Sequence, residues 1–450
     1  MSLTFSTQSF RTTTLEHHPW GEAVRRILKT ALEAVQPARL LQDQVWVENK
    51  VLRIANNTYP LHKHSKKLLL AIGKASLTMA QAWLELPGMP PPDAGLAVVK
   101  HITDHNFSKI PVVEGSHPVP DERSLEAGQR VKDLLSGLSA RDLVVCLISG
   151  GGSALVVLPS PGVSLADIRS LTEALLRCGA TIAEINLVRR HLDLLKGGGL
   201  ARLAFPARVL TLILSDVPGN SLETVASGMT APDPTTVQEA RAIFEKYRLH
   251  QHVPPSVLQG LTETLKPGDP VFARVQNTLI GSNVNARQAA WRQAQAEGFH
   301  TCLLEPDLQG EACEAARMLC AVLRRVHTAG VPVPRPACLI AGGETTVTLG
   351  KSSGRGGRNQ ELALAAVNEL AGLPNVMLVT LATDGEDGPT DAAGAVVTGE
   401  TARRANMAGL DPDRMLAYHD SCSFFTALGD AIKIGPTGTN VNDLVLLFAF

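Results

Sequence analysis

The sequence predicts an α/β protein built from two α/β domains, of which the first holds a Rossmann-like parallel sheet with helices on both faces. Short apolar runs at residues 68–72, 143–148 and 209–214 each lead into a polar turn that is followed by a helix-like segment. This alternation is typical of a parallel sheet covered by helices. At 450 residues, the chain is also too long for one ordinary hydrophobic core.

The domain boundary is predicted within the proline-rich residues 231–270. We expect an N-terminal domain over residues 18–260 and a C-terminal α/β domain over residues 270–450. The second half restarts the alternation, with apolar runs at residues 278–280, 300–304, 338–341 and 376–382. Ligands of such sheets collect at the carboxyl ends of the strands, where the polar turns of this chain fall.

Composition narrows the classes of partner. The formal net charge is −1, so the chain has no overall basic field for nucleic acid or for an acidic membrane. No apolar run is long enough to span a bilayer, and the first twenty residues lack the apolar core of a secretory signal. The seven cysteines are scattered without a C-x-x-C pair, which argues against a zinc site or a disulfide framework. We expect a cytoplasmic protein with small-molecule substrates that acts as a monomer or homodimer.

A triple-glycine loop follows the apolar run at residues 143–148. Without Cβ atoms, its backbone N–H groups can approach a phosphate closely, and flanking hydroxyls can add donors. The pattern is neither the dinucleotide fingerprint, because Leu155 replaces the third glycine, nor a Walker A loop. A tight strand-to-helix turn has the same composition. The loop residues are Ser149, Gly150, Gly151, Gly152 and Ser153.

Two charged residues stand at other strand ends. Lys74 follows residues 68–72 at an expected helix start, where the helix dipole disfavours a cation unless an anion is bound. Asp216 follows residues 209–214, and its carboxylate is suited to accept a proton from an attacking hydroxyl or to hold a metal. The alternatives are an exposed turn lysine and a turn-forming aspartate.

A second glycine-rich segment carries several cations. Lys196 directly precedes Gly197 and Gly198, and Arg190 lies earlier in the same segment. This pattern suggests a clamp for a carboxylate or a phosphate. A solvated basic helix face explains the same residues.

The second half offers a closing loop and a carboxylate cluster. Residues 350–360 fail the Walker A test, since residue 345 is not glycine, but Arg355 and Arg358 suit a loop that closes over anionic groups. Asp384 and Asp387 belong to an acidic run of the kind that suits Mg²⁺ completed by substrate phosphates. A flexible surface loop and a hydrated acidic turn are the alternatives. Together with the first-half loops, these residues favour phosphoryl transfer.

Several longer motifs follow one another along the chain, at residues 73–76, 149–155, 190–198, 215–219, 342–346, 354–361, 383–385 with 391, and 435–443. In these motifs the chain resembles the glycerate 2-kinases that have a C-terminal MOFRL domain. The resemblance covers nearly the whole chain, with one local departure at residues 419–423, where we expect asparagine in place of His419 and tyrosine in place of Cys422.

The resemblance implies transfer of the γ-phosphate of ATP to D-glycerate, giving 2-phosphoglycerate, with Mg²⁺ and in a cleft between the two domains. It places the MOFRL segment at about residues 335–447 and suggests Lys74, Asp216 and Arg355 as the catalytic group. It adds Glu344 to Arg190 and Arg358 as residues of the substrate site or closing loop. Members also carry the name hydroxypyruvate reductase, so an NAD(P)H-dependent reductase is one alternative. A non-catalytic protein that binds an organic acid or a nucleotide is the other.

Overall fold

The computed structural model describes residues 5–102, 107, 109–350 and 354–450. The chain forms two compact units, one of residues 40–280 and one that joins the residues up to Arg39 to residues 281–450. The sequence predicts residues 18–260 as one domain, whereas the structure places the helices before residue 40 with the C-terminal half. Residues 278–280, predicted to belong to the second half, are part of an edge strand of the first sheet.

The sheet of the 40–280 unit confirms the predicted Rossmann-like fold. Its order is β6-β5-β4-β7-β8-β9, and the strands β6 to β8 pair in parallel. The chain runs outward from β4 on one side, returns to β7, and runs outward on the other, so the order reverses between β4 and β7. A crevice for ligands is expected at the carboxyl ends of these two strands. The strands are β4 (Lys67–Ile72), β5 (Ala94–Val99), β6 (Val112–Glu114), β7 (Leu143–Ser149), β8 (Arg208–Leu214) and β9 (Val275–Gly281).

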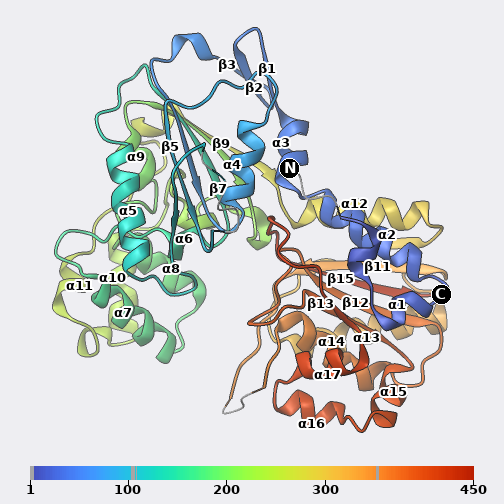
Figure 1. Cartoon of the computed structure of the whole chain (residues 1–450). Coiled ribbons are helices and arrows are strands. Elements are labelled where there is room, and N and C mark those ends of the chain that lie inside the picture. The colour runs from blue at the N-terminus through green and yellow to red at the C-terminus, as the bar shows by residue number, and fades with distance from the viewer. Residues whose placement is uncertain (1–4, 103–106, 108, 351–353) are drawn as a thin grey trace. The chain divides into compact units, whose positions relative to one another are not determined.

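Helices cover both faces of this sheet, as Figure 1 shows for α4 (Ser76–Leu84) and α5 (Glu122–Leu134). Side chains alternate between the two faces of a strand. Leu70 therefore joins the core that contains Val131 of α5, while Leu69 borders a small cavity with Trp83 of α4. All seven residues of β7 are buried, which explains the unbroken apolar run that the sequence shows there.

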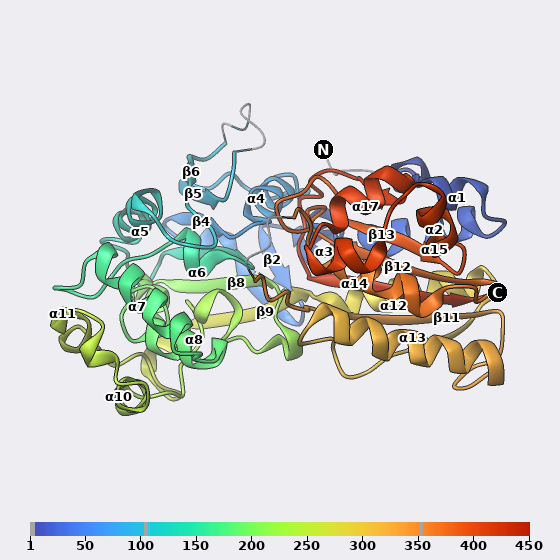
Figure 2. The same cartoon turned by 90° about the horizontal axis from the view of Figure 1, so that it is seen from below.

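Several helices of this unit begin at side-chain caps that are recognisable in the sequence. Capping boxes at Asp121, Ser164, Thr181 and Thr236 satisfy the first N–H groups of four helices. Four helices share a core of their own, separate from the sheet, and Figure 2 shows them together: α7 (Leu165–Arg177), α8 (Ile182–Arg190), α10 (Val237–Lys246) and α11 (Pro255–Gln259). The short helices are α6 (Gly152–Leu155) and α9 (Gly199–Ala204).

The start of this unit holds a small sheet that the sequence analysis does not predict. After α3 (Pro37–Gln44), three antiparallel strands follow one another: β1 (Val45–Glu48), β2 (Val51–Ile54) and β3 (Asn57–Pro60).

The other unit contains a mixed sheet of order β10-β11-β15-β12-β13-β14. Only β10 and β11 pair in parallel, and the fully buried β15 is antiparallel to both of its neighbours, β11 and β12. The strands are β10 (His300–Leu303), β11 (Ala337–Gly343), β12 (Val376–Ala382), β13 (Gly394–Thr398), β14 (Ala431–Ile432) and β15 (Asp443–Ala449).

Helices lie on both faces of this second sheet as well. Figure 1 shows α2 (Gly21–Glu33) with α12 (Asn283–Ala296) on one face and α13 (Ala312–Ala329) with α14 (Arg358–Leu370) on the other. The shorter helices are α1 (Thr13–His17), α15 (Thr401–Met407), α16 (Pro412–Ala417) and α17 (Ser421–Leu428). None of the helices in the described part of the chain has both the length and the apolar character that crossing a bilayer requires.

Candidate active site

The loops after β4 and β7 lie against each other at the point where the strand order reverses. The backbone N–H of Lys74 donates to the carbonyl oxygen of Gly150 at 2.9 Å, and the N–H of Ala75 donates to the buried Ser149 Oγ at 3.0 Å. Gly73 adopts a φ of 128°, and a Cβ on it would lie 2.2 Å from Ser149 Oγ. Glycine is required at residue 73 on both counts, and Ser149 joins the two loops rather than pointing a hydroxyl at a ligand.

Asp216 contacts the same loop from the end of β8. A Cβ on Gly150 would lie 1.5 Å from Asp216 Oδ2, so the carboxylate occupies the space that any larger residue at position 150 would fill. A Cβ on Gly151 would lie 3.1 Å from Lys74 Cγ. The structure thus brings Lys74, Asp216 and the triple glycine together at the carboxyl ends of the strands, where the sequence places all three turns.

His117 is a site residue that the sequence analysis missed. It follows the short strand β6, and its Cδ2 would lie 3.2 Å from a Cβ on Gly151, so it borders the loop beside Lys74. Burial lowers the pKa of His117 to about 4, and the charges of Lys74 and Lys100 add to this effect. The imidazole is therefore neutral near pH 7. The one available signal is its place at a strand end, between Ser116 and a proline.

The low pKa of His117 makes a testable contribution to acid sensitivity. The unfolded chain binds a proton at His117 below about pH 6.5, whereas the folded chain binds it only below about pH 4. The free energy of unfolding therefore contains the full contribution of neutral His117 above pH 6.5 and loses it as the pH falls toward 4. We expect the melting temperature of His117→Gln to fall less than that of the parent chain between pH 7 and pH 4. The exposed His252→Gln is the control. Identical pH profiles for the His117 variant and the parent would contradict the assignment.

A left-handed turn supports the end of the triple-glycine loop. Ala226 and Ser227 adopt φ values of 48° and 59°, a conformation that costs non-glycine residues about 1–2 kcal/mol each. Ser227 Oγ lies 2.7 Å from Ser153 Oγ, and a Cβ on Gly152 would lie 2.9 Å from the Ala226 Cβ. Ser153 is therefore held by this turn.

The second glycine segment supports the same turn from behind. The N–H groups of Gly197 and Gly198 donate to the carbonyl oxygens of Ser227 and Gly228 at 3.0 and 2.8 Å. The buried Lys196 Nζ donates to Asp193 Oδ2 at 2.5 Å, and burial lowers its pKa. Because these donors are engaged within the protein, we leave Lys196, Gly197 and Gly198 out of the proposed phosphate site.

Arg190 is also engaged inside the first unit. Its Nε lies 3.1 Å from Asp233 Oδ2, its Nη1 donates to the carbonyl oxygen of Glu223 at 3.3 Å, and the side chain is 7% exposed. These contacts tie the end of α8 to the segments that follow β8. They favour a structural role over a substrate clamp.

In the other unit, Asp387 caps a helix. Its Oδ1 accepts from the N–H of Asn359 at 3.0 Å and its Oδ2 from the N–H of Gln360 at 2.8 Å, and both side-chain amides donate to the same carboxylate. Asp387 is 1% exposed, and burial raises its pKa to about 6. A carboxylate already bonded to four donors at the start of α14 is poorly suited to hold Mg²⁺, so we also leave Asp387 out of the metal site.

Arg358 forms an ion-pair network at the first residue of α14. Its Nε and Nη2 donate to the two carboxylate oxygens of Asp443 at 2.5 and 3.2 Å, and its Nη1 donates to Glu344 Oε1 at 2.5 Å. Burial opposes the charge on Arg358, but the carboxylates of Asp443 and Glu344 raise its pKa. Arg358 at the start of α14 is therefore a close neighbour of Glu344, which follows β11, and of Asp443, which begins β15.

Arg355 and Asp384 keep more exposed positions. The N–H of Arg355 donates to Asp420 Oδ1 at 3.1 Å and its carbonyl oxygen accepts from Cys422, so the backbone is fixed while the side chain is exposed. Asp384 follows β12, and its Oδ1 accepts from the N–H of Glu386 at 3.2 Å. Residues 351–353 of the predicted closing loop lie outside the described residues. Across the described ranges, no group of three or more His, Cys, Asp or Glu side chains could hold a metal ion.

The fold and the site define an α/β enzyme of Rossmann strand order that gathers a lysine, a carboxylate and a glycine loop where the strand order reverses. Residues 23–262 match the family model described as a domain of unknown function, DUF4147, and residues 337–443 match the MOFRL family. The chain belongs to the glycerate 2-kinase family whose members carry a C-terminal MOFRL segment.

Named relatives and a solved structure support this membership. The chain is 38% identical to the glycerate 2-kinase of Pyrococcus horikoshii, over 94% of this chain and 95% of that one. It is 39% identical to a putative hydroxypyruvate reductase of Agrobacterium vitis, over 94% and 93%. The crystal structure of glycerate kinase from Thermotoga maritima is similar with a TM-score of 0.83 and 39% identity, covering 95% of this chain and 99% of that one.

Proposed function

We propose that this chain is a glycerate 2-kinase, which transfers the γ-phosphate of ATP to the C2 hydroxyl of D-glycerate and releases ADP and 2-phosphoglycerate. The observation that carries the proposal is the meeting of Lys74, Asp216 and Gly150 at the reversal of strand order. Phosphoryl transfer requires positioning and charge neutralisation more than covalent chemistry by the protein. The identity of the substrate is inferred from the relatives that are named glycerate kinases.

Each of these residues has a distinct role in the proposal. The C2 hydroxyl oxygen forms a bond to the γ-phosphorus as the bond from that phosphorus to the bridging oxygen of ADP breaks, and the hydroxyl proton passes to the Asp216 carboxylate. The Lys74 ammonium offsets the negative charge on the transferred group. N–H groups of Gly150 to Ser153 contact phosphate oxygens, and the neutral His117 adds no second positive charge beside Lys74.

Arg355 and Mg²⁺ complete the proposal. The exposed side chain of Arg355 on a fixed backbone suits contact with an anionic group, as the family resemblance implies. Asp384 is the residue that would hold Mg²⁺, which would enter with ATP. When bound, the ion would neutralise phosphate charge.

The reductase alternative lacks a structural observation in its favour. The helix after the triple glycine, α6, has only 4 residues, and Leu155 occupies the place of the third glycine of the dinucleotide fingerprint. The pyrophosphate of a dinucleotide is usually bound at the start of a longer helix packed on the sheet.

An assay with two arms tests the proposal on the purified full chain. The first arm supplies ATP, Mg²⁺ and D-glycerate, measures ADP by a coupled reaction, and identifies the product by phosphorus NMR. The second supplies NAD(P)H and hydroxypyruvate without ATP. We expect equal amounts of ADP and 2-phosphoglycerate from the first arm and no oxidation of NAD(P)H in the second. NAD(P)H oxidation without ATP consumption would overturn the kinase, and 3-phosphoglycerate would overturn the assignment of the C2 hydroxyl.

A further inference from the structure

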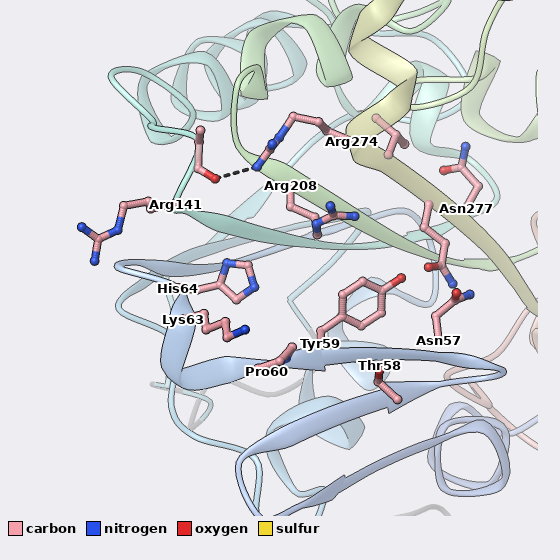
Figure 3. A pocket seen from close by; sticks show the side chains of 13 residues that line it. Asn57, Thr58, Tyr59, Pro60, Lys63, His64, Arg141, Arg208, Arg274 and Asn277 are labelled. Atoms are coloured by element: carbon pink, nitrogen blue, oxygen red, sulfur yellow. Dashed lines mark hydrogen bonds between the residues drawn. The ribbon is translucent and has the colours of Figure 1, made fainter.

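The 40–280 unit contains a polar pocket at the amino ends of its strands. We call it the amino-end pocket; its volume is about 860 Å³, within the range of small-molecule sites. Figure 3 shows side chains from β3 and the turn after it facing side chains that precede or begin β8 and β9. It is lined by residues 57–60, 63–64, 140–141, 208 and 274–277.

The amino-end pocket is strongly basic. Lys63, Arg141, Arg208 and Arg274 all line it, and no Asp or Glu among the described residues does. Within the described part of the chain, none of these four cations forms an ion pair with a carboxylate, whereas Arg26 and Lys246 do. Concentrated positive charge without a carboxylate partner attracts multivalent anions.

Three arginines converge because of the parallel sheet. Arg208 is the first residue of β8, Arg274 directly precedes β9, and Arg141 lies two residues before β7. β7 and β8 pair in parallel and β9 is the next strand in the sheet, and all three arginines line the same pocket at this edge. Asp216 lies beyond the other end of β8, roughly 26 Å away at about 3.3 Å per strand residue. The amino-end pocket is therefore separate from the candidate active site.

Its floor combines an aromatic ring with buried polar atoms that lack partners. The Arg208 guanidinium lies 5.9 Å from the centre of the Tyr59 ring, which is 8% exposed. The Nη2 of Arg274 donates to the carbonyl oxygen of Ala140 at 2.6 Å, whereas its Nε and the Nδ1 of His64 are buried without a hydrogen-bond partner. A buried polar atom left without a partner destabilises the protein, and a bound ligand that pairs with it would remove that cost.

We infer that the amino-end pocket binds a small phosphate ester or polyphosphate, at a site distinct from the one that carries out phosphoryl transfer. Arginine forks match the oxygens of a phosphate, and three of them around one cavity favour a multivalent anion. Tyr59 offers a flat apolar surface, and the amides of Asn57 and Gln276 offer donors and acceptors to the body of the ester. The pocket lies within one unit and needs no other part of the chain.

Calorimetric titration of the full chain with inorganic pyrophosphate, at low ionic strength and without divalent ions, tests the inference. Two double variants weaken the pocket: Arg208→Gln with Arg274→Gln at its floor, and Lys63→Gln with Arg141→Gln at its exposed rim. The control, Arg202→Gln with Arg241→Gln, removes the same charge from exposed residues outside the pocket. Because the rim pair is exposed, it keeps the test valid if the floor variant fails to fold.

We expect the parent chain and the control to bind one equivalent of pyrophosphate in the amino-end pocket, separate from the triple-glycine loop, and each pocket variant to bind that equivalent at least about tenfold more weakly. Melting temperatures of all variants confirm that they are folded. Equal binding by the parent, the control and both pocket variants would overturn the inference, as would an absence of binding to the parent. Citrate is the second probe, and citrate binding that is tighter than pyrophosphate binding and is lost in the pocket variants would overturn the assignment to phosphate.

Discussion

Asp216→Asn is expected to lower kcat for ATP-dependent phosphorylation of D-glycerate by about 10²–10⁴-fold, the usual contribution of a positioned general base. The amide keeps the shape of the side chain against Gly150 but cannot accept the proton of the C2 hydroxyl. KM for ATP should change little, because the proposal gives Asp216 no contact with the nucleotide. Steady-state rates with both substrates varied measure the two effects separately.

The matched control is Asp133→Asn on the exposed face of α5, which makes the same change of charge far from the β8 end. It should retain the parental rate. If Asp216→Asn keeps a rate within a few-fold of the parent while it melts at the same temperature, Asp216 takes no part in proton transfer.

Gly150→Ala should reduce kcat by about 10²-fold or more, through the position of the same carboxylate. The added methyl would lie 1.5 Å from Asp216 Oδ2, far inside an ordinary contact of at least 3.4 Å, so the carboxylate must move by well over an ångström. Displacements of about 1 Å near a reacting group typically cost two orders of magnitude in rate. The same kinetic assay, with a melting curve, checks the result.

Gly162→Ala controls for a general loss of stability. Gly162 has a φ of 84° and nothing within 4 Å of an added Cβ, so alanine there costs about 1 kcal/mol of stability without a clash. We expect a lower melting temperature and an unchanged kcat. A normal rate in Gly150→Ala would mean that the chemistry does not depend on where the Asp216 carboxylate lies.

The first sheet could be predicted because its signals are local. Each parallel strand is a buried apolar run, and each run ends in a turn whose composition is visible in a few residues. The convergence of Lys74, Gly150 and Asp216 follows from the rule that the carboxyl ends of parallel strands share one edge. The sequence could not show that Asp216 lies against Gly150, because that contact depends on the side-by-side packing of β7 and β8.

The remaining site residues depend on distant partners. The donors of Gly197 and Gly198 are occupied by a turn about 30 residues further along the chain, and Asp387 caps a helix that begins 29 residues before it. The sequence of an acidic or glycine-rich run does not show whether its polar groups are free or already hydrogen-bonded within the protein. The sequence around residues 278–280 also contains no feature that assigns this strand to the first sheet rather than to the second.

The division of the chain into units has a consequence for the order of folding. Residues 40–280 are continuous, but the other unit needs contacts across that whole interval: α2 packs on α12, Arg26 pairs with Glu297, and Thr439 Oγ1 donates to the carbonyl oxygen of Val35 at 2.6 Å. A ribosome releases the continuous unit first, and domains generally fold as they emerge. The apolar face that α2 buries against α12 therefore stays uncovered until the later segment is synthesised, so nascent chains expose it to chaperones or to aggregation during that interval.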